Sequence, residues 1–79
     1  MTQKEALQIK YDALARAQAV IMEWFKAHDY YSMKILTGEW LETDAKWTQY
    51  LHDREFYRAE YDRIDEARIL ISEQIQKAE

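Results

Sequence analysis

The sequence predicts an all-α protein that folds as one long antiparallel helical hairpin. The chain has 79 residues, a single glycine, Gly38, close to its middle, and no proline. On both sides of Gly38 apolar residues recur at spacings of three and four, which is typical of amphipathic helices. We therefore expect a helix over about residues 3–36, a turn at Gly38 and a second helix over about residues 40–77. Thr37, Thr43 and Asp44 are the candidate N-caps of the second helix, so its start is expected between Glu39 and Ala45. A chain of this length forms one domain, so residues 1–79 are predicted to be a single helical domain.

The first arm begins at a recognisable cap. Thr2 and Glu5 form a Thr-x-x-Glu capping box, which predicts a helix start near Gln3. The predicted inner row of this arm repeats every seven residues: Leu7, Leu14, Ile21, His28 and Ile35. Asp29 interrupts a run of residues with high helix propensity, and aspartate is more favourable at a helix cap than in a helix interior. A break near Asp29 with a short middle helix is therefore the alternative to one continuous helix.

The second arm carries two rows of the same period. They are Tyr50, Tyr57, Ile64, Ile71 and Ala78, and beside them Trp47, Arg54, Tyr61, Arg68 and Ile75. When the chain is folded back at Gly38, the inner rows of both arms meet in phase. The expected facing pairs are Leu7 with Ile71, Leu14 with Ile64, Ile21 with Tyr57, His28 with Tyr50, and Ile35 with Thr43.

Two helices cannot cover all the apolar side chains of this sequence. The residues left over are Ile9, Val20, Met22, Leu36, Leu41, Leu51, Phe56, Ile69 and Leu70. We expect a homodimer that forms an antiparallel four-helix bundle. The alternative is a three-helix arrangement, broken near Asp29, that folds the aromatic residues inward.

Composition argues against several classes of function. The formal net charge is −4, which opposes binding to nucleic acid through its phosphates. No cysteine is present, so disulfides and thiolate metal sites are excluded. No apolar run approaches the ~20 residues of a membrane span, and we expect a cytoplasmic protein with no membrane contact. Neither a nucleophile motif nor a glycine-rich phosphate loop occurs, so an enzyme is not expected and no cofactor is predicted.

Aromatic residues gather around the predicted turn. Ten of the eleven lie between Trp24 and Tyr61. Those in the helix seams are expected to pack: Trp24, Phe25, Trp47, Tyr57 and Tyr61. Four others form a candidate partner-binding surface, because aromatic and arginine side chains dominate interaction hot spots; they are Tyr30, Tyr31, Trp40 and Phe56. Arg54 occupies a seam position where leucine is expected, so it joins this candidate surface as an interface residue.

The two histidines support a different hypothesis. His28 and His52 come within about one helical turn in the expected register, with carboxylates nearby, which allows a metal or small-ligand site. The metal motifs Glu-x-x-His and His-x-x-x-His are missing, and the competing interpretation is a packed His28 hydrogen-bonded to Tyr50. The sequence thus favours a non-enzymatic helical protein–protein interaction module that self-associates through its heptad faces. The alternatives are a bundle that binds a ligand near His28 and His52, and an accessory regulator of a nucleic-acid-acting protein without nucleic-acid contact.

Overall fold

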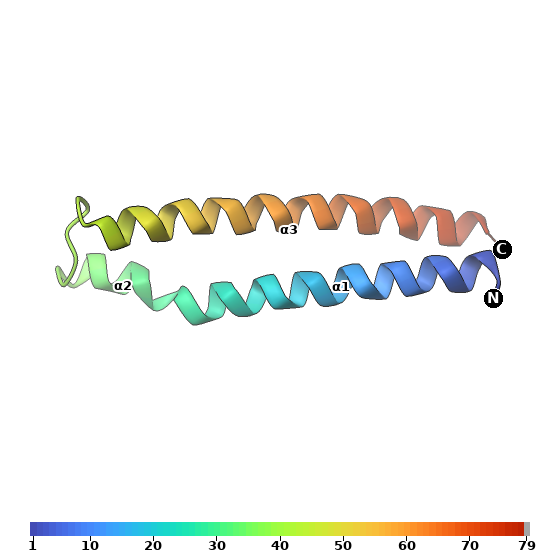
Figure 1. Cartoon of the computed structure of the whole chain (residues 1–79), viewed down its shortest axis with the longest axis horizontal. Coiled ribbons are helices and arrows are strands. Elements are labelled where there is room, and N and C mark those ends of the chain that lie inside the picture. The colour runs from blue at the N-terminus through green and yellow to red at the C-terminus, as the bar shows by residue number, and fades with distance from the viewer. Residues whose placement is uncertain (79) are drawn as a thin grey trace.

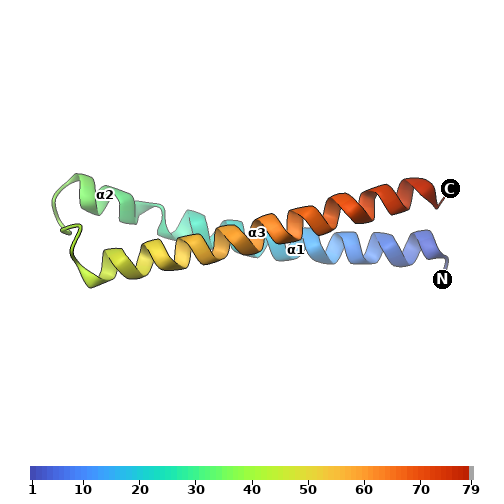
Figure 2. The ribbon, with the colours of Figure 1, turned by 90° about the horizontal axis from the view of Figure 1, so that it is seen from above.

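The computed structural model describes residues 1–78, which form an all-α helical hairpin (Figure 1). Its elements are α1 (Gln3–His28), α2 (Tyr30–Leu36) and α3 (Ala45–Lys77). α2 continues the direction of α1, so the two form one bent arm that lies antiparallel to α3. The hairpin measures 56 × 16 × 15 Å, and its arms cross at a shallow angle (Figure 2). The predicted hairpin is confirmed, and Glu79 of the predicted 1–79 domain lies outside the described residues.

The break near Asp29 is a bend. Asp29 keeps right-handed helical angles, with φ −59° and ψ −32°, and its carbonyl accepts a hydrogen bond from Ser32 N at 3.3 Å. A short middle helix therefore forms, as the alternative interpretation expected. It does not fold back to make a compact three-helix arrangement, because helical angles at the break leave the chain direction nearly unchanged.

Gly38 makes the turn, as predicted. Its φ of +77° lies in the left-handed region, which glycine adopts without a side-chain clash. Its N–H donates to Ile35 O at 3.1 Å, which ends α2. We call the end of the hairpin around this turn the corner, and the end with the two termini the open end.

The second helix begins at Ala45, the last position of the expected range, and Asp44 is its cap. Asp44 has an extended backbone, and its side chain accepts a hydrogen bond from Lys46 N at 2.8 Å. This cap satisfies an amide at the helix start, so α3 begins at Ala45 and residues 37–44 form a loop. At the other end of the hairpin Thr2 caps α1 by accepting from Glu5 N at 3.1 Å, as the capping box predicted.

The core of the hairpin is thin. Among the described residues, the buried apolar side chains are Leu7, Ile21 and Tyr50, all in the predicted inner rows. The fourth buried residue is Gln18, which is only 3% exposed. Two helices in contact along one side leave the rest of each helix open to solvent.

The register of the arms agrees with the predicted one to within three residues. Side chains in contact across the hairpin include Tyr11 with Arg68, Trp24 with Tyr57, and Tyr31 with Tyr50. His28 was predicted to face Tyr50, and Tyr31, three residues later, takes that place. No helix in residues 1–78 has both the length and the apolar character that crossing a membrane requires.

Candidate functional site

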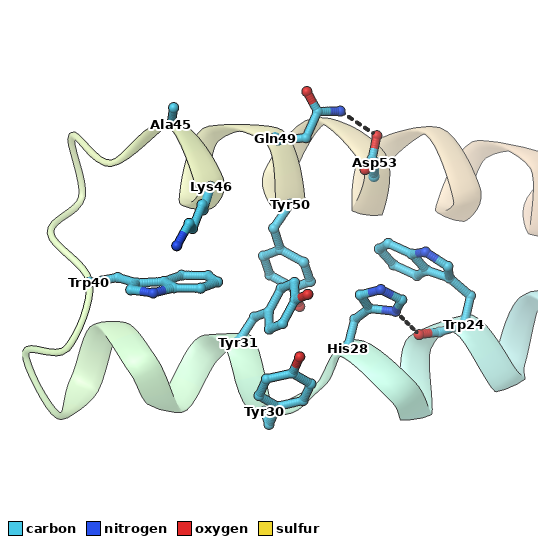
Figure 3. Close-up of a pocket in the computed structure, with 10 residues that line it drawn as sticks. All are labelled: Trp24, His28, Tyr30, Tyr31, Trp40, Ala45, Lys46, Gln49, Tyr50 and Asp53. Carbon is cyan, nitrogen blue, oxygen red and sulfur yellow. Dashed lines mark hydrogen bonds between the residues drawn. The ribbon is translucent and has the colours of Figure 1, made fainter.

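A groove of about 580 Å³ lies between the arms next to the corner (Figure 3). We call it the corner groove. Its lining residues are Trp24, His28, Tyr30, Tyr31, Trp40, Ala45, Lys46, Gln49, Tyr50 and Asp53. The first arm supplies four rings, the loop supplies Trp40, and the first turns of α3 supply the polar side. The bend at Asp29 and the late start of α3 therefore both shape this groove.

A chain of aromatic contacts forms its floor. The Trp24 ring stacks on His28 at 4.4 Å between centroids and lies 6.1 Å from Tyr50. Tyr31 continues the chain, 5.2 Å from Tyr50 and 5.0 Å from Trp40. Because rings in such offset and edge contacts hold one another in place, the groove has a rigid apolar base.

Polar side chains from successive turns of α3 form one edge of the groove. Gln49 Nε2 donates to Asp53 Oδ1 at 2.8 Å, and Lys46 Nζ lies 5.8 Å from the Trp40 ring centroid. A second ammonium group, that of Lys34, lies 5.5 Å from the same ring and pairs with Glu39 at 2.8 Å. The edge is thus positive next to the corner and negative two turns further along α3.

Tyr30, next to the bend, has a raised pKa. A side-chain hydrogen bond with Tyr31 raises the pKa of the Tyr30 phenol, and partial desolvation raises it further. The two rings meet edge to face at 4.4 Å. Both effects favour the neutral phenol.

The structure brings together three of the five predicted partner-binding residues. Tyr30, Tyr31 and Trp40 all line the corner groove. Phe56 lies outside it, 57% exposed, with its ring edge against Tyr57. Arg54 is exposed and lines a separate groove of about 280 Å³ on the other side of the hairpin.

The two histidines are not gathered into one site. His28 Nδ1 donates to Trp24 O at 2.8 Å, which corrects the predicted hydrogen bond to Tyr50. His52 points to solvent and lies 3.9 Å from Asp53. Within residues 1–78, no group of three or more His, Cys, Asp or Glu side chains is placed to hold a metal ion.

A polar layer near the middle of the hairpin was not expected from the sequence. Arg68 donates from Nη1 to Gln18 Oε1 and from Nη2 to Tyr11 Oη, the latter at 2.9 Å. Gln18 Nε2 in turn donates to Tyr61 O and to Asp65 Oδ1, both at 3.3 Å. The available signal was position: Gln18 follows Leu14 by four residues and precedes Ile21 by three, which places it in the seam.

The structure therefore offers an apolar, aromatic surface next to the corner and a polar layer in the middle of the hairpin. Such a surface suits contact with another apolar surface, since half-exposed rings lose unfavourable contact with water when they are covered. No protein-family model matches the chain, and the searches of curated proteins and of solved structures find no match either.

Proposed function

We propose that this chain is a non-enzymatic protein–protein interaction module that associates with a second copy of itself. The observation that carries the proposal is the exposed apolar surface. The large apolar side chains more than half exposed include Ile9, Val20, Met33, Leu36, Leu41, Phe56, Ile69 and Leu70. They outnumber the three buried ones in the part of the chain that the structure describes.

The thin core gives a physical reason for association. A single core in a chain of this length supplies only a few kcal/mol, and oligomerisation is one of the usual ways to add more. Each additional apolar side chain covered by a partner contributes about 25 cal/mol per Å² removed from water. Association thus stabilises the hairpin while it covers the exposed side chains.

The aromatic corner of the hairpin provides a further contact surface for a partner. Tyr30, Tyr31 and Trp40 meet there, and Leu36 at the end of α2 and Leu41 in the loop are exposed. Aromatic side chains that are fixed in place and partly exposed are common hot spots of protein interfaces. The loop of residues 37–44 offers this surface at the end of a rod, where a partner can reach it.

Light scattering coupled to size exclusion tests self-association. At micromolar concentration we expect a mass of twice 9.6 kDa, together with a melting temperature that rises with protein concentration. A mass of 9.6 kDa and a melting temperature independent of concentration would refute the proposal.

A further inference from the structure

We infer that the second copy docks antiparallel on the side of the hairpin that carries the corner groove, so that its open end covers the groove. This inference rests on the proposed self-association and specifies its surface and register. We call this side the groove flank. The result is a closed, two-fold symmetric four-helix bundle.

The groove flank of α1 can be traced from the groove by helix periodicity. Trp24 and Tyr31 line the groove and follow the buried inner row by three residues. Residues seven apart share one side of a helix, so their row extends to the open end. That row is Lys10, Ala17, Trp24 and Tyr31, and the row next to it is Ala6, Ala13, Val20 and Ala27. Apart from Lys10, both rows are uncharged, and Val20 is 71% exposed.

α3 contributes two rows to the same flank. Asp53 and Gln49 line the groove, and their rows continue at intervals of seven residues. The first row is Asp53, Glu60, Ala67 and Gln74, and the second is Gln49, Phe56, Arg63 and Leu70. Phe56 and Leu70 are 57% and 60% exposed, so this flank presents large apolar side chains along with small ones.

The opposite flank is less suited to a partner. It carries the half-buried Tyr11 and Arg68, which are hydrogen-bonded to each other. Its middle groove is lined by Arg54, Arg58 and Asp62 as well as by Met22, Phe25 and Tyr61. Covering these charged groups would remove their hydration, a cost that apolar side chains do not carry.

In an antiparallel pair, α1 meets α1 of the second copy with large side chains opposite small ones. A two-fold axis level with Gln18 places Tyr31 opposite the partner's Ala6, Trp24 opposite the partner's Ala13, and Val20 opposite the partner's Ala17. Small residues let the helices approach closely, and each ring then fills the space above an alanine. The corner of one copy thus lies on the open end of the other.

The same axis brings matching residues of α3 together. Gln18 contacts Tyr61 across the hairpin, so the axis crosses α3 next to Tyr61. Phe56 then lies opposite the partner's Ala67, and Glu60 opposite the partner's Arg63. Within one copy Glu60 already pairs with Arg63 at 2.6 Å. The Glu60 and Arg63 side chains of the two copies therefore form a group of four charges of alternating sign around the axis. One register therefore satisfies both arms.

Lys10 and Asp53 supply the remaining charge complementarity. Lys10 lies near the open end, and Asp53 lies in the corner groove with His28. The two are separated by roughly 25 Å along one hairpin, given a rise of 1.5 Å per residue. The two-fold axis brings Lys10 level with the partner's Asp53, and the symmetry repeats this pair.

The flank is large enough for a stable dimer. A hairpin 56 Å long and 16 Å wide offers roughly 900 Å² on one flank, close to the ~800 Å² per partner of standard interfaces. The charged residues outside the four flank rows stay in solvent.

A double charge reversal tests the register. Lys10→Glu and Asp53→Lys should each weaken the dimer on the order of tenfold, because each reverses two contacts per dimer. The variant with both changes should regain most of the wild-type dissociation constant, measured by sedimentation at several concentrations. Since the two residues of one copy lie too far apart to couple, recovery can come only through the second copy.

A pair of alanines on different faces of α1 provides the control. Ala13→Glu puts a carboxylate into the inferred interface and should make the protein monomeric. Ala19→Glu lies toward the opposite flank, is equally exposed, and should leave the mass unchanged. A stable wild-type dimer without recovery in the double reversal, and with both alanine variants alike, would overturn this inference while leaving self-association standing. A wild-type mass of 9.6 kDa would overturn both.

Discussion

Replacing Gln18 with leucine should destabilise the hairpin even though it adds an apolar side chain to the core. Among residues 1–78 Gln18 is the most buried, at 3% exposed, and it accepts a hydrogen bond from the Arg68 guanidinium. Leucine removes that acceptor and both amide hydrogen bonds. Arg68 Nε is already buried without a partner, so the guanidinium would keep only its hydrogen bond to Tyr11.

The expected loss is about 1–2 kcal/mol. A hydrogen bond to a charged group contributes about 1.5–3 kcal/mol, whereas the two amide bonds at 3.3 Å are long and add little. Arg68 is only half-buried, so it can turn toward water and recover part of the loss. Replacing both partners, as Gln18→Leu with Arg68→Leu, should restore stability to within about 0.5 kcal/mol of wild type or exceed it.

Urea unfolding followed by circular dichroism measures these differences, with all variants at one protein concentration because association contributes to stability. Gln8→Leu is the matched control: Gln8 is exposed and donates a hydrogen bond to Asp12 at 3.0 Å, so its change should stay within about 0.5 kcal/mol. A single Gln18→Leu variant as stable as wild type, or a double variant whose loss is the sum of the single losses, would refute the proposed role of this layer.

Two further predictions concern the corner. Gly38→Ala should lower the free energy of unfolding by about 1 kcal/mol, and Gly38→Asn by less, because asparagine tolerates positive φ better. No steric clash contributes to this loss, because nothing lies within 4 Å of the position of an added Cβ. Equal melting temperatures for the wild type and both variants would contradict a turn at positive φ. Tyr30 should titrate above the ordinary tyrosine pKa, and Tyr31→Phe should lower its pKa, as followed by ¹³C NMR of labelled tyrosine rings. Because folding raises the pKa of Tyr30, any stability that its neutral phenol contributes is present below the ordinary tyrosine pKa and is lost as the pH rises through the folded value. An unchanged Tyr30 pKa in the Tyr31→Phe variant would assign the shift to another cause.

The hairpin, its cap and its turn could be read from the sequence because they depend on local chemistry. Thr2 with Glu5 sets the start of α1, and Gly38 alone can supply positive φ at low cost. The inner rows also identified Leu7, Ile21 and Tyr50 as core residues, since a seven-residue repeat fixes which side of a helix faces the other arm.

The candidate site could be predicted only in part. The aromatic rings were recognised as a group, and Tyr30, Tyr31 and Trp40 do meet in the corner groove. Phe56 was assigned to the same surface as an aromatic residue outside the seams, and Arg54 as a seam residue in the place of leucine. Phe56 instead lies further along α3, outside the groove, and Arg54 lines a groove on the other side of the hairpin. Nearness along a helix does not bring side chains together unless their spacing matches its turn.

The sequence by itself determined the helices, their reversal at Gly38 and the excess of apolar side chains. These properties follow from periodicity, from conformational preference and from composition, all of which act locally. Tertiary structure decided the burial of Gln18 with Arg68, the contact of Tyr31 with Tyr50, and the meeting of Tyr30, Tyr31 and Trp40 in the corner groove. These depend on which side chains from the two arms arrive at the same level, and a stagger of up to three residues between helices changes every such partner.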